Sequence, residues 1–332
     1  MTVLALIVPC YNEQEVLPET CRRMVALLNR LSDAGKISTE SRIYFVDDGS
    51  KDDTWSIIES CVRDGLPVVG IKLSRNRGHQ NALIAGLFTA EGDALVSIDA
   101  DLQDDVNAIE TMVDRYLEGS DVVYGVRKRR ESDTFFKRFT AESFYRLIAL
   151  LGAQTIYNHA DYRLLSRRAI DALKEYREVN LFLRGIIPLI GFESTIVEYD
   201  RDARFAGESK YPLKKMIALA LDAVTSFSVI PLRLITFIGF LVFLFATGMS
   251  VFILWIRLFT DIAVPGWTST LLPIYFLGGI QILCLGIMGE YLGKIYAESK
   301  ARPRYIIEQV RRARRAPHAV VDADEPADRM SN

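Results

Sequence analysis

The stretch Ala94-Leu95-Val96-Ser97-Ile98-Asp99-Ala100-Asp101-Leu102-Gln103 decides the fold of this chain. An apolar run ends abruptly in two carboxylates two positions apart, and an amide follows. This pattern is typical of a buried strand whose C-terminal end lies at a ligand site, as in open α/β sheets. Asp99 and Asp101 are hard oxygen ligands suited to Mg²⁺ or Mn²⁺. The alternative is that Asp-x-Asp forms only a polar turn.

Three similar apolar runs precede this stretch, and each also ends in polar residues. They cover residues 3–9, 43–46 and 68–73. A helix is predicted over residues 19–31. A second should begin at about residue 53, after the second run, and a third should follow the third run and end at about residue 87. Strand, loop and helix repeated in this way predict a doubly wound, mostly parallel sheet with right-handed crossovers. The polar strand ends should therefore meet in one cleft.

The strand ends lack both common phosphate-binding glycine patterns. No Gly-x-Gly-x-x-Gly follows the first strand, and no Gly-x-x-x-x-Gly-Lys-Ser/Thr is present. Acidic strand ends would instead meet a nucleotide through its base, its ribose hydroxyls and a metal ion on its phosphates. The sequence thus argues against a dinucleotide Rossmann site and a P-loop ATPase.

The composition argues against further classes of protein. The chain has 332 residues, half of them hydrophobic, and its net charge of -2 argues against a nucleic-acid partner. Four scattered cysteines without a Cys-x-x-Cys pair indicate neither a zinc site nor a disulfide framework, which favours a reducing compartment. The first residues predict a strand rather than a secretory signal.

Two long uncharged runs, Leu234 to Ile256 and Leu271 to Gly289, follow the predicted α/β region. They predict a transmembrane hairpin over residues 231–293, with spans of about 232–257 and 269–291; a buried pair of core helices is the alternative. Basic residues after the second run place both termini and the α/β domain in the cytoplasm, beneath the inner (plasma) membrane. Residues 213–230 are expected to form an interfacial amphipathic helix, and 294–332 a basic tail, disordered at its end.

Three motifs carry a resemblance to a known family. Val8-Pro9-Cys10-Tyr11-Asn12-Glu13, Val46-Asp47-Asp48-Gly49-Ser50 and Asp99-Ala100-Asp101-Leu102-Gln103 resemble the signatures of family 2 glycosyltransferases of the GT-A fold. The resemblance covers nearly the whole chain. It extends to the polyisoprenyl-phosphate glycosyltransferases, the group of bactoprenol glucosyltransferase and dolichol-phosphate mannose synthase, which add a C-terminal transmembrane hairpin. It implies a cytoplasmic GT-A domain over residues 1–212.

The resemblance also implies roles for particular residues. The nucleotide sugar would be held by Pro9, Tyr11, Glu13, Val46, Asp48, Asp99 and Ala100. The metal and the diphosphate would be surrounded by Asp99, Asp101 and Gln103, with Arg127 near the diphosphate. Arg204 and Lys210 would bind the acceptor phosphate, unless they belong only to a solvated basic loop.

The segment around Asp161 supplies the candidate acceptor-side carboxylate, so that the catalytic candidates are Asp161, Asp101 and Arg127. The structural alternative for Asp161 is a pair with Arg163 or a cap on the helix of Ser166 to Leu173. His79 is expected to start a helix near the nucleotide.

The function expected from this resemblance is inverting, metal-dependent hexose transfer to a polyprenyl phosphate such as undecaprenyl phosphate. UDP-glucose or UDP-N-acetylglucosamine is the preferred donor, and Mg²⁺ or Mn²⁺ the cofactor. A lipid monophosphate is mostly dianionic near neutral pH, so Asp161 would orient a substrate rather than remove a proton. The alternatives are a GDP-mannose-dependent mannosyltransferase, a processive polysaccharide synthase, whose Gln-x-x-Arg-Trp motif is absent, and a non-enzymatic membrane scaffold. Homo-oligomer formation is left open.

Overall fold

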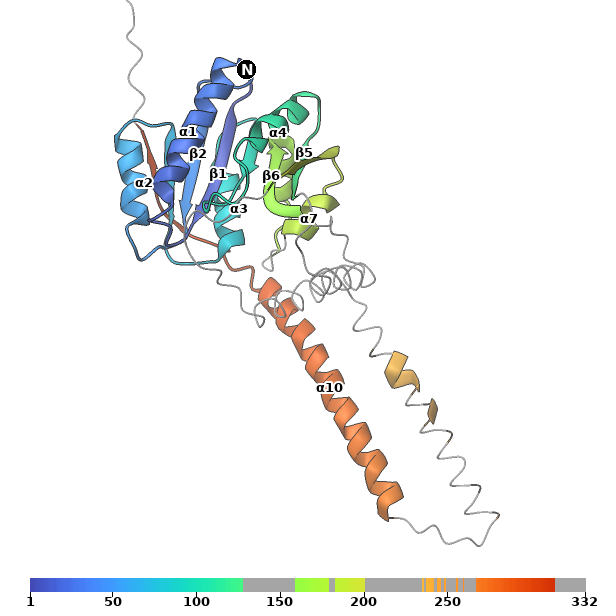
Figure 1. Cartoon of the computed structure of the whole chain (residues 1–332). Coiled ribbons are helices and arrows are strands. Elements are labelled where there is room, and N and C mark those ends of the chain that lie inside the picture. The colour runs from blue at the N-terminus through green and yellow to red at the C-terminus, as the bar shows by residue number, and fades with distance from the viewer. Residues whose placement is uncertain are drawn as a thin grey trace, which may run out of the picture.

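The computed structural model describes residues 1–127, 159–178, 183–200 and 267–313, together with single positions between 235 and 259. Strands and helices alternate along the first half of the chain (Figure 1). The strands are β1 (Leu4–Cys10), β2 (Arg42–Asp47), β3 (Val68–Leu73), β4 (Ala94–Ser97), β5 (Val122–Arg127), β6 (His159–Ser166), β7 (Ser194–Tyr199) and β8 (Ile307–Arg312). The helices are α1 (Leu17–Asp33), α2 (Thr54–Arg63), α3 (His79–Thr89), α4 (Ala108–Leu117), α6 (Arg167–Lys174), α7 (Leu183–Leu189) and α10 (Trp267–Ser299).

The strands form one mixed sheet of order β7-β5-β6-β4-β1-β2-β3-β8. β1 pairs in parallel with β2 and β4, and β2 pairs in parallel with β3, which confirms the predicted parallel region. Antiparallel β6 lies between β4 and β5, and β7 runs parallel to β5 at the far edge. Because β1, β2, β3 and β4 run in the same direction, their C-terminal ends lie at one edge of the sheet.

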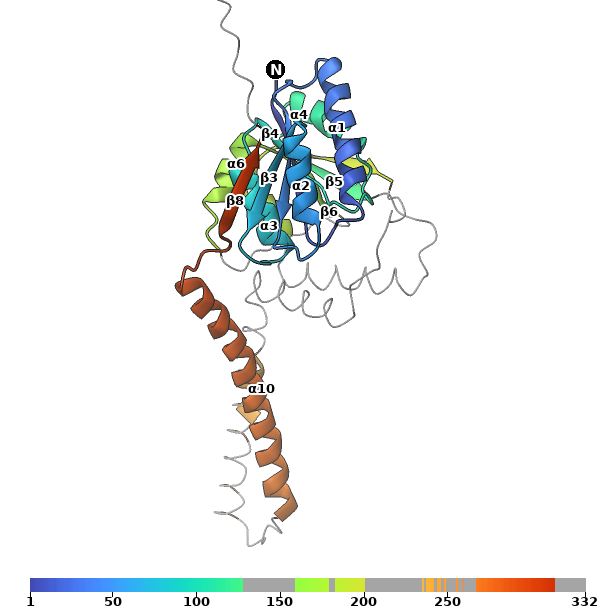
Figure 2. The same cartoon turned by 90° about the vertical axis from the view of Figure 1, so that its left-hand side faces the viewer.

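Helices cover both faces of the sheet, as expected for strands that are apolar on both sides. Buried side chains of α1, α2 and α4 pack with one set of strand residues in the first core cluster. Buried side chains of α3, α6 and α7 pack with the opposite set in the second cluster. Figures 1 and 2 show this layered arrangement from two directions. The result is the predicted α/β architecture, with the strand ends free to build a site.

The C-terminal region differs from the expectation of a basic tail over residues 294–332. α10 continues to Ser299, and β8 then pairs antiparallel with β3 as the last strand of the sheet. Arg311 pairs with Glu59 at 3.1 Å and Arg312 with Glu91 at 2.9 Å. Part of the predicted tail is therefore a strand of the α/β domain, which is built from both ends of the chain.

The 33-residue helix α10 contains the second uncharged run and projects away from the sheet (Figures 1 and 2). Within the residues that the structure describes, no helix has the length and apolar character needed to cross a bilayer. The predicted interfacial helix over 213–230, most of the first predicted span and the end of the tail lie outside the described residues.

Candidate active site

The loops after β1 and β2 are joined by hydrogen bonds into one unit. The backbone N–H of Asn12 donates to Ser50 Oγ at 3.0 Å, and Asn12 Oδ1 accepts the backbone N–H of Lys51 at 2.9 Å. The backbone N–H of Glu13 donates to Thr54 Oγ1, the first residue of α2, at 2.9 Å. These bonds hold Asn12 at a φ of 54°, a conformation that non-glycine residues seldom adopt. The first two motifs therefore form one preorganised surface.

Asp48, at the end of the second motif's strand, holds the loop that follows β3. Its carboxylate oxygens accept the backbone N–H groups of Arg77 at 2.7 Å and Gly78 at 2.8 Å. Burial raises the pKa of Asp48 above its ordinary value, although these two hydrogen bonds favour the ionised form. The contact of Asp48 with the nucleotide stays a prediction. The structure shows that the Asp48 carboxylate also binds the backbone N–H groups of Arg77 and Gly78.

The third motif forms a tight turn at the end of β4. The backbone N–H of Gln103 donates to Asp101 Oδ1 at 3.2 Å, and Leu102 has a φ of 55°. The Asp99 side chain is 39% exposed. Partial desolvation of this carboxylate raises the pKa of Asp99, and the neighbouring His79 opposes that shift.

The same turn can be tested as a cation site. Among the described residues, no group of three or more His, Cys, Asp and Glu side chains could hold a metal ion. Magnesium, however, is commonly held by one or two carboxylates together with substrate phosphates, rather than by a cage made only of protein. Asp99 and Asp101 fit that donor set, and the buried Gln103 contacts Asp101 through its backbone N–H.

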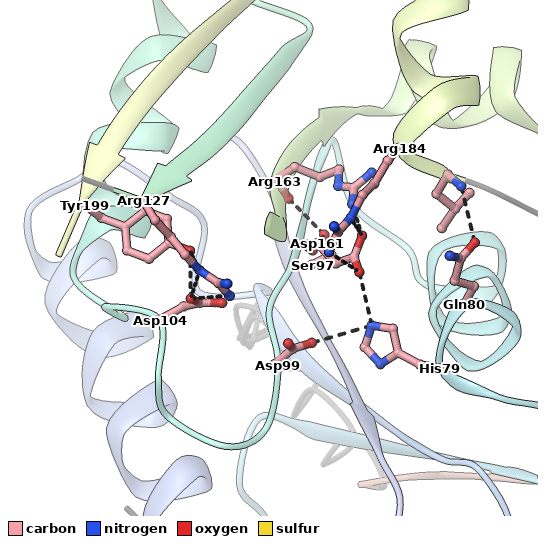
Figure 3. A network of polar contacts seen from close by, with 11 residues as sticks. His79, Gln80, Ser97, Asp99, Asp104, Arg127, Asp161, Arg163, Arg184 and Tyr199 are labelled. Atoms are coloured by element: carbon pink, nitrogen blue, oxygen red, sulfur yellow. Dashed lines mark hydrogen bonds and ion pairs between the residues drawn. The ribbon is translucent and has the colours of Figure 1, made fainter. Parts of the chain in front are cut away.

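Asp161 lies among three cationic or imidazole side chains (Figure 3). It forms an ion pair with Arg163, whose side chain is only 1% exposed, and a two-point contact with Arg184 at 3.2 Å for each pair of atoms. Ser97 Oγ donates to the Asp161 backbone carbonyl at 2.7 Å, which ties the backbone of Asp161 to the end of β4. Burial alone would raise the pKa of Asp161, but Arg163 and Arg184 hold that pKa well below its usual range. The carboxylate is therefore ionised at neutral pH.

The Asp161–Arg163 pair is the structural alternative that the sequence left open, and it is present. The other alternative, a helix cap, is instead provided by Ser166, whose Oγ accepts the backbone N–H of Ala169 at 3.1 Å. Asp161 thus serves as the counter-charge of a buried guanidinium, while 15% of its own side chain stays exposed.

Arg127 belongs to a second polar group, shown at the left of Figure 3. Its Nη2 lies 3.1 Å from Asp104 Oδ1, and its Nε lies 3.2 Å from the Tyr199 hydroxyl. Tyr199 donates to the same Asp104 oxygen at 2.6 Å. Asp104, which is almost fully buried, partly neutralises Arg127, so the expected diphosphate contact would add to an existing ion pair.

The remaining predicted residues differ in their positions. Pro9, Val46 and Ala100 are buried, so that their side chains face the protein interior. Tyr11 is 40% exposed beside the loop after β1. Arg204 and Lys210 lie outside the described residues.

Sequence reasoning missed Arg184, Asp104 and Tyr199, which stand in no recognised motif. It placed His79 correctly at the start of a helix but not between two carboxylates. In each case the relevant partner comes from a distant part of the chain, so local spacing carries no signal. The one local hint was the second acidic pair, Asp104-Asp105, directly after the third motif.

Comparison with protein families matches residues 5–174 to the family described as Glycosyl transferase family 2. The chain belongs to this family. The glycosyltransferase is 49% identical over 310 residues to the uncharacterized glycosyltransferase YkoT of Bacillus subtilis (strain 168), covering 92% of this chain and 91% of that one. It is 40% identical over 313 residues to the bactoprenol glucosyl transferase of Shigella phage SfV, covering 92% and 98%.

Among solved structures, glucosyl-3-phosphoglycerate synthase from Mycobacterium tuberculosis, in complex with Mn²⁺ and UDP, is 18% identical with a TM-score of 0.43. That alignment covers 68% of this chain and 76% of the other. At this level of similarity, the ligands of that enzyme say nothing about this glycosyltransferase.

Proposed function

We propose that this glycosyltransferase moves a hexose from a nucleotide sugar, UDP-glucose or UDP-N-acetylglucosamine, to a polyprenyl phosphate such as undecaprenyl phosphate. Two findings support the acceptor class. The chain is similar over almost its full length to proteins named bactoprenol glucosyl transferase. Within the site, Asp161 has a chemical state that suits an acceptor of this kind.

The similarity to bactoprenol glucosyl transferases carries the proposal, and the ion pairs of Asp161 are compatible with it. An efficient general base has a pKa near the operating pH, so that it can both take and release a proton. Asp161 is held far below that range by Arg163 and Arg184. An alcohol acceptor needs a base, whereas a phosphate monoester with a second pKa of about 6 is already ionised at neutral pH. An ionised Asp161 held by two arginines is therefore compatible with an acceptor that needs no base.

The donor would lie along the ends of β1, β2 and β4. Tyr11, Glu13 and Asp48 would contact the nucleotide, and the backbone at Pro9, Val46 and Ala100 would line its path. Asp99, Asp101 and Gln103 would hold Mg²⁺ or Mn²⁺, and a cation bound there would neutralise charge that develops on the leaving diphosphate. Arg127, already oriented by Asp104 and Tyr199, would contribute a further positive charge. Direct attack by the acceptor would invert the anomeric carbon.

The acceptor lipid implies a membrane location. We place the protein in the inner (plasma) membrane as a hairpin, with its catalytic domain and both termini in the cytoplasm. Support comes from the two uncharged runs and from large apolar side chains that are exposed outside the α/β domain. They include Phe237, Phe240, Phe245, Ile274, Leu285, Leu292 and Ile295. Exposed apolar surface of this extent is typical of a membrane or protein interface. Arg204 and Lys210 would bind the lipid phosphate at the membrane surface.

The test is a panel of donors and acceptors with purified protein. UDP-glucose, UDP-N-acetylglucosamine and GDP-mannose are each supplied with Mg²⁺ or Mn²⁺, with and without undecaprenyl phosphate, and release of the nucleoside diphosphate is measured. We expect release from a UDP-sugar that depends on the lipid phosphate and on the metal. Efficient release with GDP-mannose would instead identify the mannosyltransferase alternative. Release with a sugar or oligosaccharide acceptor, but not with the lipid, would overturn the proposal.

A further inference from the structure

The second motif shapes the loop between β3 and α3. Gly49 has a φ of +68°, and a Cβ atom at this position would lie 2.7 Å from both the Arg75 carbonyl carbon and the Asn76 nitrogen. The missing side chain therefore allows the loop to pass directly over the end of β2. Asp48 then fixes the loop by accepting two successive backbone N–H groups, those of Arg77 and Gly78.

These two hydrogen bonds to Asp48 determine where α3 begins. Gly78 adopts a φ of +87°, which favours glycine, and α3 starts at the next residue, His79. Because both N–H groups that Asp48 holds lie immediately before His79, the carboxylate sets the position of the His79 backbone. A change at Asp48 should thus be felt at His79 even though the two side chains belong to different loops.

The His79 ring lies between two carboxylates, those of Asp99 and Asp161 (Figure 3). Its Nε2 lies 3.5 Å from Asp99 Oδ1 and 3.9 Å from Asp161 Oδ2. Asp99 follows β4 on the predicted donor side, and Asp161 lies on β6 on the predicted acceptor side. The imidazole, 41% exposed, is thus placed where the two substrates would meet.

The two carboxylates need such a group because like charges repel each other in a partly buried cleft. Asp161 is held from one side by Arg163 and Arg184, so its position is fixed. The imidazole, whose Nε2 lies near one oxygen of each carboxylate, extends this fixed arrangement to Asp99. Without it, Asp99 would turn away from Asp161.

We propose that His79 is a positioning residue for glycosyl transfer, which holds the donor-side Asp99 against the acceptor-side Asp161, and that Asp48 acts on the reaction through His79. This inference rests on the proposed function, because it assigns the two carboxylates to the two substrates. It predicts that His79 affects the rate at which bound substrates react more than it affects their binding.

The experiment measures kcat and both KM values for the full-length wild-type protein and for His79→Ala, His79→Gln, Asp48→Asn and the Asp48→Asn/His79→Ala double variant. We expect His79→Ala to lower kcat about tenfold, which corresponds to about 1.4 kcal/mol, while the donor KM changes less than threefold. The glutamine variant keeps an N–H donor and should recover most of the lost rate. Asn76→Ala, an exposed position in the same loop, is the matched control and should stay within twofold of wild type.

The double variant tests the role of Asp48. If Asp48 acts through His79, the double variant should be no more than about threefold slower than the slower single variant, because the two effects share one pathway. If the rate losses of the two single variants instead multiply in the double variant, Asp48 does not act through His79 and that part of the inference is overturned. A His79→Ala variant with wild-type kcat, or a glutamine variant no faster than alanine, would overturn the role of His79.

The two levels of failure are distinguishable. Absence of lipid-dependent transfer by the wild-type protein would count against the proposed function. Normal transfer by the wild type together with unaffected His79 variants would count against this inference only. Thermal unfolding of each variant shows whether a rate loss reflects misfolding, and the exposed position of His79 makes the alanine and glutamine variants compatible with the fold.

Discussion

Replacing Asp161 by asparagine should destabilise the α/β domain strongly, because it removes the counter-charge of a buried guanidinium. The Arg163 side chain is 1% exposed, and Arg184 also loses its two-point contact. Breaking a buried ion pair by removing one partner costs about 3–5 kcal/mol. For a domain of this size, that corresponds to a fall of roughly 6–20 °C in the unfolding temperature. The asparagine has nearly the same volume, so packing contributes little to the expected loss.

The assay is thermal or urea unfolding of the purified variant, followed by the tertiary signal of the domain. Asp171→Asn is the matched control, because Asp171 pairs with Lys174 at 2.8 Å on the surface and should change stability by less than about 0.5 kcal/mol. Since the folded pKa of Asp161 is lowered, its contribution should be constant above the unfolded pKa of about 3.9 and should fade as the pH drops below it. If Asp161→Asn lowers the free energy of unfolding by less than about 1 kcal/mol, and by no more than the control does, Asp161 is not the counter-charge on which Arg163 depends.

Three further predictions concern the loops and the substrates. Gly49→Ala should lower the free energy of unfolding by at least about 1 kcal/mol more than Gly65→Ala does. Both glycines have positive φ, but only at Gly49 would the new Cβ atom crowd backbone atoms. Equal losses in urea unfolding would argue against the close approach of the loop. Asp101→Asn should reduce metal-dependent turnover about 100-fold or more with unchanged folding, and normal turnover with an ordinary Mg²⁺ titration would remove Asp101 from the metal site. Arg204→Ala should raise the apparent KM for polyprenyl phosphate about tenfold and leave the donor KM unchanged; a rise in the donor KM alone would move Arg204 to the donor diphosphate.

The parallel half of the fold was predictable because its strands carry a strong local signal. β1 to β4 are short, mostly apolar runs that are followed by polar residues, and burial on both faces requires that composition. The expected strand at 68–73 matches β3, and the helix expected over 19–31 lies within α1, Leu17–Asp33.

β8 could not be predicted in the same way. Its sequence, Ile-Glu-Gln-Val-Arg-Arg, is short and half charged, and none of its residues is fully buried, as is typical of an edge strand. Its partner β3 lies in the first quarter of the chain, and no local pattern reports pairing over that distance. A run of basic residues after an apolar segment is more typical of a tail, which is how this segment was interpreted.

The candidate site was predictable where acidic side chains stand at strand ends within a motif. Asp99, Asp101 and Asp48 stand at strand ends, so their meeting at one edge follows from the topology of the sheet. The partners of Asp161 and Arg127 do not follow from it: Arg184 lies on α7, and Tyr199 ends the edge strand β7. Their contacts depend on how β6 and β7 fold back beside β4 and β5, which is a property of the whole fold.

The most direct measurement is mass spectrometry of the lipid product after purified protein is incubated with a UDP-hexose, Mg²⁺ and undecaprenyl phosphate. The account predicts a new lipid with one hexose on its phosphate, in the β configuration when the donor is α-linked, and none when Asp101 is replaced by asparagine. Free hexose and UDP without a glycosylated lipid, or a product whose sugar is not attached to the phosphate, would contradict the assignment of this enzyme to polyprenyl-phosphate glycosylation.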